Sequence, residues 1–314
     1  MRVHLQTLGC RLNEAEAQGW ARELTAAGHL LVDDPARADL VICNTCAVTG
    51  AATRKSRQLV RRLRRDSPAA ELVVTGCYGT LHAAQAARDL GIDRLVGNAD
   101  KDRLARLVAA PHAAAPAGSP RRAQQLGRER VFLKVQDGCR YRCAFCVVTA
   151  ARGDEVSRPL PELVAEVRAL VAAGVPEVVL TGVHVGGYGS DRGSSLTALV
   201  AALLAETAVP RLRLASVEPW ELSDAFFALF ADPRLLPHLH LPLQSGSDAV
   251  LRAMARRGRR DDFRALVTRA RERVPGLNLT SDLIAGFPGE SDADWAQTLE
   301  LVDELAFGDL HVFP

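Results

Sequence analysis

Three cysteines in one short stretch carry the strongest chemical signal in the sequence. Cys139, Cys143 and Cys146, the loop cysteines, form a C-x3-C-x2-C pattern, and the aromatic Phe145 directly precedes the third. A [4Fe–4S] cluster normally takes four thiolates, so three thiolates leave one iron open to a chelating small molecule. A structural zinc site needs four ligands, usually as two separated pairs, so a zinc knuckle or reduced surface thiols explain the pattern less well.

Three further cysteines, Cys10, Cys46 and Cys77, each follow a short apolar segment with the character of a strand. The carboxyl ends of parallel strands share one edge of a sheet, where ligands collect. We therefore expect these strand-end cysteines to converge as a second three-ligand iron–sulfur site, the alternative being three unrelated buried thiols. Cys43 forms C-x2-C with Cys46, but it lies inside an apolar run, so we interpret it as a small buried hydrophobic residue and not a ligand.

The elements that must position the strand-end cysteines are strands alternating with helices. Strands are expected at 2–7, 39–45, 71–76 and 94–97. Helices are expected at about 13–28, from 49, from 77 to 89 and up to 110. This alternation is typical of an α/β fold with a parallel sheet. The helix at 53–65 carries seven basic residues, which form either a solvated face or a phosphate-binding surface.

The second half of the chain repeats the alternation. Residues 111–128 are rich in Pro, Ala and Gly and are predicted to be an interdomain linker between an N-terminal domain (1–110) and a second domain (129–314). Strands are then expected at 131–135, 177–183, 211–217, 238–244, 277–287 and 309–313. Helices are expected at about 161–173, 195–206, 248–273 and 291–304. Such a pattern predicts a partial (β/α)6 barrel with its active site at the carboxyl ends of the strands.

The residues around both cysteine sets resemble those of the radical S-adenosylmethionine (SAM) methylthiotransferases. K-V-Q-D-G-C precedes the second and third loop cysteines, and A-R-G…S-R-P follows them. T-L-G-C-R-L-N-E, N-T-C-A-V-T and V-T-G-C-Y surround the strand-end cysteines and are similar to the N-terminal domain of that family. The resemblance implies two [4Fe–4S] clusters and SAM, with the radical SAM cluster on the loop cysteines and an auxiliary cluster on the strand-end cysteines.

The strand ends of the predicted barrel are similar to SAM-binding segments of the superfamily. The resemblance implies that the end of the second strand meets the methionyl amine, the fourth the ribose, and the fifth and sixth the adenine. The implied SAM contacts are Phe145, Thr181, Gly182, His184, Glu218, Gln244, Ser245, Ile284, Gly286 and Val312. His238 and His240 share one face of the fourth strand and are interpreted as polar residues lining the barrel.

The resemblance also implies an activity. In the family the auxiliary cluster carries sulfur, and SAM cleavage activates an unreactive C–H bond, with the cofactors supplying the chemistry. T-L-G-C-R-L-N and T-G-V-H-V-G-G-Y-G are most similar to the enzymes that methylthiolate threonylcarbamoyladenosine in tRNA. The implied partners are a tRNA anticodon loop and an electron donor such as flavodoxin or ferredoxin. The alternatives are isopentenyladenosine tRNA, a ribosomal protein aspartate, or a non-catalytic iron–sulfur RNA-binding protein.

Composition sets the remaining bounds. The net charge of +2 does not by itself indicate a nucleic-acid partner. Seven cysteines in ligand-like spacing favour metal in a reducing compartment over disulfides. We find no signal peptide and no membrane-spanning apolar run, so we expect a cytoplasmic protein. The chain stops at Pro314, where the resembled family continues into a last barrel helix and a small RNA-holding β-domain, so we expect either a truncated chain or one that works without that domain.

Overall fold

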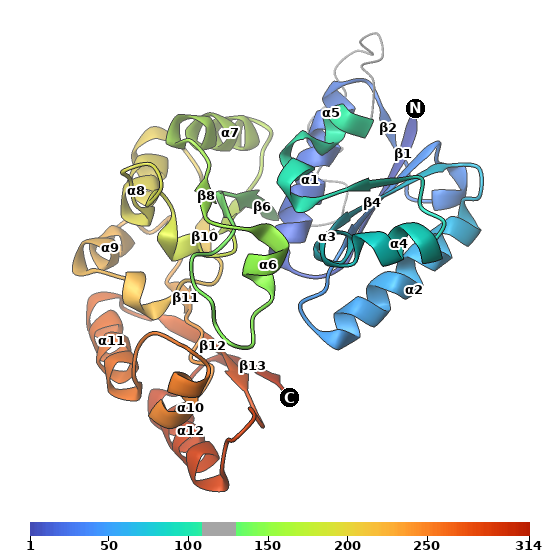
Figure 1. Cartoon of the computed structure of the whole chain (residues 1–314). Helices are drawn as coiled ribbons and strands as arrows, with labels where there is room; N and C mark the ends of the chain where they lie inside the picture. The colour runs from blue at the N-terminus through green and yellow to red at the C-terminus, as the bar shows by residue number, and fades with distance from the viewer. Residues whose placement is uncertain (109–129) are drawn as a thin grey trace. The chain divides into compact units, whose positions relative to one another are not determined.

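The computed structural model describes residues 1–108 and 130–314, which form two compact units. The first unit comprises Met1–Lys134 and Val147–Asp154, and the second comprises Val135–Cys146 and Glu155–Pro314. Each unit has its own parallel strands and packed helices (Figure 1).

The domain limits expected from the sequence, 1–110 and 129–314, remain a prediction. The predicted linker at 111–128 lies outside the described residues. The short segment Val147–Asp154 follows the loop cysteines in the sequence but groups with the first unit.

The first unit is built on a five-stranded parallel sheet with the order β2-β1-β3-β4-β5. The strands of this unit are β1 (Arg2–Thr7), β2 (Leu30–Leu31), β3 (Leu40–Thr45), β4 (Glu71–Gly76), β5 (Arg94–Val96) and β6 (Arg130–Lys134). Its helices are α1 (Arg11–Ala26), α2 (Gly50–Asp66), α3 (Cys77–Leu81), α4 (Ala83–Asp89), α5 (Leu104–Val108) and α6 (Val148–Arg152). The expected α/β fold with a parallel sheet is confirmed, while the short edge strand β2 and helix α6 were not predicted.

Alternate residues of β3 pack into two hydrophobic layers, because successive side chains of a strand point to opposite faces. Leu40 and Ile42 join a cluster that contains Trp20 of α1. Val41 and Cys43 join the opposite cluster, which contains residues of α2. Cys43 is fully buried there, and burial raises the pKa of its thiol to about 12. Its expected burial in the core is therefore confirmed.

Helix α2 buries one apolar stripe and leaves most of its basic residues in solvent. Thr49 caps its first turn by accepting a hydrogen bond from the backbone N–H of Ala52 at 3.1 Å. Arg64 is not part of the free basic face, because its guanidinium donates to the carbonyl oxygen of Gly91 at 2.7 Å and pairs with Asp93. The exposed basic residues are Arg54, Lys55, Arg61, Arg62 and Arg65.

The second unit alternates strands with helices. Its strands are β7 (Gln136–Asp137), β8 (Val156–Ser157), β9 (Glu177–Thr181), β10 (Leu212–Leu214), β11 (His238–His240), β12 (Asn278–Ile284) and β13 (Asp309–Phe313). Its helices are α7 (Leu160–Ala172), α8 (Leu196–Glu206), α9 (Asp224–Ala228), α10 (Asp248–Ala253), α11 (Arg260–Arg273) and α12 (Asp292–Leu305). β9 pairs in parallel with β10, and β11, β12 and β13 pair in parallel with one another. This arrangement is the expected partial barrel pattern.

The single helix expected at 248–273 is two helices, α10 and α11, joined by a turn. Ala255 and Gly258 of this turn have positive φ angles of 53° and 97°, which end an α-helix. The carbonyl oxygen of Met254 accepts the backbone N–H of Ala144 at 2.9 Å, so the turn also holds the loop that carries the cysteines. In the described residues, no helix combines the length and the apolar character that crossing a membrane requires.

Candidate functional site

The strand-end cysteines follow three neighbouring strands of the first unit. Cys10 follows β1, Cys46 follows β3, and Cys77 begins α3 after β4. Burial raises the pKa of Cys46, and the nearby charges of Cys10 and Cys77 raise it further, while backbone N–H groups of Val48 and Ala47 lower it. All three are free thiols. A soft, closely grouped thiol set of this kind fits iron–sulfur coordination.

Two glycines allow the three strand ends to approach this closely. Gly76 has φ +97°, and a Cβ there would lie 2.2 Å from the carbonyl oxygen of Thr45. Gly9 has φ +117°, and a Cβ there would lie 2.6 Å from the Cβ of Cys46. Both positions therefore require glycine for conformational and steric reasons. Gly9, before Cys10, thus makes room for the side chain of Cys46, and Gly76, before Cys77, makes room for the backbone of Thr45.

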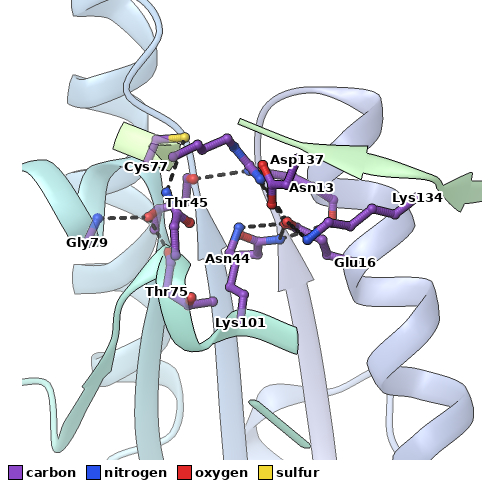
Figure 2. A network of polar contacts seen from close by, with 12 residues as sticks. Asn13, Glu16, Asn44, Thr45, Thr75, Cys77, Gly79, Lys101, Lys134 and Asp137 are labelled. Carbon is purple, nitrogen blue, oxygen red and sulfur yellow. Dashed lines mark hydrogen bonds and ion pairs between the residues drawn. The ribbon is translucent and has the colours of Figure 1, made fainter. Parts of the chain in front are cut away.

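A buried polar network lies at the same strand ends (Figure 2). The Glu16 carboxylate accepts from Lys101 Nζ at 2.5 Å, from Arg152 Nη1 at 2.9 Å and from Asn44 Nδ2 at 3.1 Å. The side chains of Glu16, Lys101 and Arg152 are all at most 2% exposed. Burial acts to raise the pKa of Glu16, but the charges of Lys101, Arg152 and Lys134 hold it well below its usual range.

Asn13 connects this network to the loops that carry the cysteines. Its Nδ2 donates to the carbonyl oxygen of Leu8 at 2.8 Å and to that of Thr45 at 3.0 Å, while its Oδ1 accepts from Arg152 at 2.8 Å. Asn98 makes a comparable link, because its Nδ2 lies 3.9 Å from Cys77 Sγ and 2.6 Å from the carbonyl oxygen of Ala151. These two asparagines tie α6 to the strand ends.

The loop cysteines lie in the second unit, on residues 138–146 (the cysteine loop), and none of them forms a disulfide within the described residues. The backbone N–H of Cys146 donates to the carbonyl oxygen of Cys143 at 3.0 Å, which places these two on one turn. Burial raises the pKa of Cys139 to about 11, with the charges of Glu155, Cys146 and Cys143 acting in the same direction. The thiols therefore lie close enough to interact, as ligands of one cluster must.

A buried acid–imidazole network adjoins Cys139. The Nδ1 of His184 pairs with Glu155, and its Nε2 lies 3.4 Å from Glu221. Burial would lower the pKa of His184, but the neighbouring carboxylates of Glu221 and Glu155 raise it overall. Conversely, the nearby His184 ring and the hydrogen bond from Tyr141 bring the pKa of Glu221 to about 2 against the opposing effect of burial. Ligand atoms of Cys139, Glu155 and His184 lie within 4.8 Å of one another, yet Glu155 and His184 already engage each other, which leaves the thiols as the soft ligands.

Arg256 connects the α10–α11 turn to the cysteine loop. Its guanidinium donates to both oxygens of Glu218, at 3.0 and 2.8 Å, and stacks over the ring of Trp220 at 4.9 Å. Burial lowers the pKa of Arg256, but Glu218 and a hydrogen bond to the Cys143 thiol raise it overall. Glu218, expected from the sequence as a SAM contact, thus forms a bidentate pair with Arg256.

The SAM contacts predicted at the end of β9 lie around the side-chain amide of Gln136. Gln136 Oε1 accepts the backbone N–H groups of Val183 at 3.1 Å and His184 at 2.9 Å, and its Nε2 donates to the carbonyl oxygen of Gly138 at 2.7 Å. A Cβ on Gly182 would lie 2.9 Å from this same Oε1, so glycine permits the contact. Thr181, the last residue of β9, is buried. Gln136 therefore fixes the β9 end to the start of the cysteine loop.

The remaining predicted contacts lie at the ends of β11, β12 and β13 or in the cysteine loop. Gln244 has a φ of +70°, a strained angle for a non-glycine residue of the kind found at functional sites. Ser245 is buried, and its hydroxyl lies 3.3 Å from that of Thr298, so it faces α12. The other four are partly or fully accessible to solvent: Phe145, Ile284, Gly286 and Val312.

His238 and His240 behave as expected of barrel residues. His240 Nδ1 lies 2.9 Å and His238 Nε2 lies 3.1 Å from the hydroxyl of Thr280. His240 Nε2 also lies 3.2 Å from Asp282. Both rings thus have polar partners on the neighbouring strand β12.

Several residues of the site were missed by sequence reasoning. Gln136 stands in the K-V-Q-D-G-C motif and Glu155 stands in the segment after the cysteines, so proximity to the motif was an available signal. Glu221 and Arg256 carry no such signal, because only the tertiary fold brings them to the cysteine loop. The Glu16–Lys101 pair joins residues 85 positions apart, which no local pattern reports.

Two family matches cover most of the chain. Residues 2–97 match the family described as Uncharacterized protein family UPF0004. Residues 133–302 match the Radical SAM superfamily, which implies a [4Fe–4S] cluster and SAM as cofactors. A solved structure of the radical S-adenosylmethionine methyltransferase TsrM from Kitasatospora setae is similar in fold, with a TM-score of 0.71 at 17% identity over 99% of this chain and 72% of that one.

Similar proteins carry the names of three different activities. The chain is 38% identical to threonylcarbamoyladenosine tRNA methylthiotransferase MtaB of Chlamydia pneumoniae, over 99% of this chain and 73% of the relative. It is 37% identical to tRNA-2-methylthio-N(6)-dimethylallyladenosine synthase of Paracoccus denitrificans, over 98% and 73%. It is 36% identical to ribosomal protein uS12 methylthiotransferase RimO of Anaeromyxobacter sp. (strain K), over 99% and 70%. Because these relatives align with 98–99% of the chain at 36–38% identity, the chain belongs to the radical SAM methylthiotransferase family.

Proposed function

We propose that the protein methylthiolates N6-threonylcarbamoyladenosine beside the tRNA anticodon, giving the 2-methylthio derivative. The observation that carries this proposal is that each unit has its own group of three neighbouring cysteine thiols, at the positions where the family motifs occur. Relatives named for this reaction, from Thermotoga maritima and Chlamydia pneumoniae, align over 99% of the chain at 34% and 38% identity. The proposed tRNA substrate also places the protein in the cytoplasm, where tRNA is modified.

In this proposal the loop cysteines hold one [4Fe–4S] cluster with an open iron for SAM. When bound, this pair supplies one-electron cleavage of SAM, which suits activation of an unreactive C–H bond. Gln136 would hold the β9 end in place against the amino-acid part of SAM, and Glu155 and Glu221 would fix the orientation of His184. The ten SAM contacts expected from the sequence remain part of the proposal, with Ser245 supporting the β11 end through Thr298.

The strand-end cysteines would hold a second cluster that carries sulfur. Asn98 would donate to the Cys77 sulfur, and backbone N–H groups of Ala47 and Val48 would donate to that of Cys46. Such hydrogen bonds stabilise thiolates and tune the clusters bound to them. The exposed basic residues of α2 are the proposed contact for tRNA phosphates, and a flavodoxin or ferredoxin is the proposed source of electrons.

Iron counting tests the two-cluster arrangement. After anaerobic reconstitution, the triple variant Cys139→Ala/Cys143→Ala/Cys146→Ala should keep about four irons, and so should the triple variant of the strand-end cysteines. Cys43→Ala is the matched control and should keep both clusters, because its thiol is buried in the core facing α2. A folded triple variant that holds no iron would refute two separate clusters.

Nucleoside mass spectrometry tests the substrate. Transfer RNA from cells with and without the gene should differ in 2-methylthio-N6-threonylcarbamoyladenosine. The relatives named for dimethylallyladenosine and for ribosomal protein uS12 are nearly as similar, at 37% and 36% identity, so those two products are measured in the same samples. A gene-dependent change in either of them, with threonylcarbamoyladenosine unchanged, would keep the chemistry and overturn the substrate.

A further inference from the structure

A cavity of about 460 Å³ lies in the second unit, between the loop after β10 and the two helices α10 and α11. Its floor is apolar and buried, with Leu243, Leu251, Phe263 and Leu266 among the lining residues. This volume lies within the range of pockets that bind small organic groups. None of the SAM contacts expected from the sequence lines it, so the cavity is distinct from those contacts.

One wall of the cavity is shared with the cysteine loop. Trp220 lines the cavity, and its indole N–H donates to the Tyr141 hydroxyl at 3.1 Å. Arg256 also lines it and reaches the Cys143 thiol and the Glu218 carboxylate. A group bound here would therefore lie next to the cysteine loop, on the far side of these two side chains.

The rim of the cavity is cationic. Arg256 is matched by Glu218, and Arg269 lies 3.3 Å from Asp224. Arg257 donates only to a neutral group, the Tyr141 hydroxyl at 3.4 Å, and no ion pair is found for Arg257 or Arg259 within residues 1–108 and 130–314.

Asp262 is the acidic residue of the lining, and its carboxylate accepts the backbone N–H of Arg259 at 3.2 Å at the start of α11. The rim thus offers two exposed guanidinium groups to an incoming anion.

We propose that this cavity binds the carboxylate-bearing N6 substituent of the modified adenosine, with Arg257 and Arg259 as specificity-determining residues. Guanidinium groups pair bidentately with carboxylates, and the apolar floor can take the methyl-bearing part of a threonyl group. An isopentenyl substituent carries no charge and would leave both guanidinium groups without a partner. This inference rests on the proposed function, because it explains how threonylcarbamoyladenosine would be distinguished from the uncharged isopentenyladenosine.

Direct binding tests the inference without any cofactor. Iron-free protein is titrated with three probes: N6-threonylcarbamoyladenosine, N6-isopentenyladenosine and adenosine 5′-monophosphate. The first should bind at least about tenfold more tightly than the second, since a charge-assisted hydrogen bond contributes this much. Arg257→Gln/Arg259→Gln should abolish that difference. Arg252→Gln, an exposed arginine of α10 outside the cavity, is the matched control and should retain it.

The outcomes separate this inference from the proposed function. Equal binding of all three probes, or a preference unaffected by Arg257→Gln/Arg259→Gln in a folded protein, would overturn the cavity assignment. Tighter binding of adenosine 5′-monophosphate would also overturn it in favour of an RNA phosphate. Either result can stand beside a methylthiolated threonylcarbamoyladenosine product in cells, which would leave the proposed function intact. Should the double variant fold poorly by circular dichroism, Arg257→Lys, which keeps the charge but loses the planar fork, should weaken the preference.

Discussion

Glu16 shows how a single residue couples burial, charge and pH. Its carboxylate is buried among Lys101 and Arg152, and these cations hold its pKa far below the ordinary glutamate value of about 4.3. A depressed native pKa means that the folded state gains stability from ionised Glu16. That contribution is fully present above the unfolded-state pKa and is lost as the pH falls through the native pKa.

We therefore expect Glu16→Gln to flatten the acid limb of the stability profile. Between about pH 4 and pH 3 the wild-type free energy of unfolding should fall by up to about 1.4 kcal/mol per pH unit more steeply than that of the variant. Denaturant unfolding of iron-free protein at each pH measures this. Asp66→Asn, an exposed carboxylate at the end of α2, is the control and should leave the slope unchanged. Parallel slopes for wild type and Glu16→Gln would contradict the ion network.

At this scale the sequence was informative about the candidate cysteines and not about the residues that support them. The loop cysteines stood out by their local spacing, the strand-end cysteines by following apolar strands, and Cys43 could be set aside because it stands inside one. The partners of Glu16, Glu221 and Arg256 come from distant segments, so their contacts depend on tertiary packing.

The strand-end cysteines depend on the loops that carry them. Gly76 has φ +97° and ψ −175°, a region open almost only to glycine. Gly76→Ala should destabilise the protein by more than about 3 kcal/mol and lower its iron content, because backbone strain and the Thr45 contact act together. Gly19→Ala is a matched control in α1, where nothing lies within 4 Å, and it should stabilise by about 0.5–1 kcal/mol. Equal stabilities measured by thermal unfolding would argue against the close packing of the loops.

Helix α2 allows tRNA binding to be tested separately from the catalytic reaction. Arg61→Glu/Arg62→Glu/Arg65→Glu should weaken tRNA binding at least about tenfold and flatten its dependence on salt, because fewer counterions are released. SAM cleavage should be unaffected. Arg64→Gln is the contrasting variant, since that arginine braces Gly91 and Asp93, and it should lower thermal stability with little effect on affinity. If the triple variant binds tRNA with unchanged affinity in filter binding, the basic residues of α2 form a solvated surface and not a phosphate-binding one.

Elements were predictable where hydrophobic periodicity was long and regular, as in α1, α2 and α12. The break between α10 and α11 was not predictable, because Ala255 adopts a positive φ angle that only its surroundings impose. Helix α6 was missed because five residues are too few to show a period.

For the whole molecule, we expect the loop cysteines and the strand-end cysteines to serve different steps of the reaction. The triple Cys→Ala variant of the strand-end cysteines should still cleave SAM under reduction, yet form no methylthio product. The variant of the loop cysteines should do neither, because that set is the proposed site of the cluster that binds SAM. Measuring 5′-deoxyadenosine and methylthio nucleoside in the same reaction distinguishes the two. Formation of methylthio product by the strand-end variant would contradict the proposal that the strand-end cysteines hold the cluster that carries sulfur.

The fold class and the family could both be recognised from the sequence, since strand–helix alternation and cysteine spacing are properties of the chain itself. Sequence similarity does not distinguish among the three substrates of the family, because relatives of all three activities align at 36–38% identity. The side chains that we propose to discriminate among them, Arg257 and Arg259, come close to the cysteine loop only on folding.

The burial of Lys101 has a practical consequence for protein chemistry. The sequence contains only three lysines, and they occupy three different environments: Lys55 is exposed on α2, Lys134 is 10% exposed, and Lys101 is inaccessible. An amine-directed acylating reagent should therefore modify Lys55 at once and Lys101 only when the first unit opens. Peptide mass spectrometry of the Lys101 adduct would then time the opening of the unit, with Lys55 in the same molecule as the internal standard.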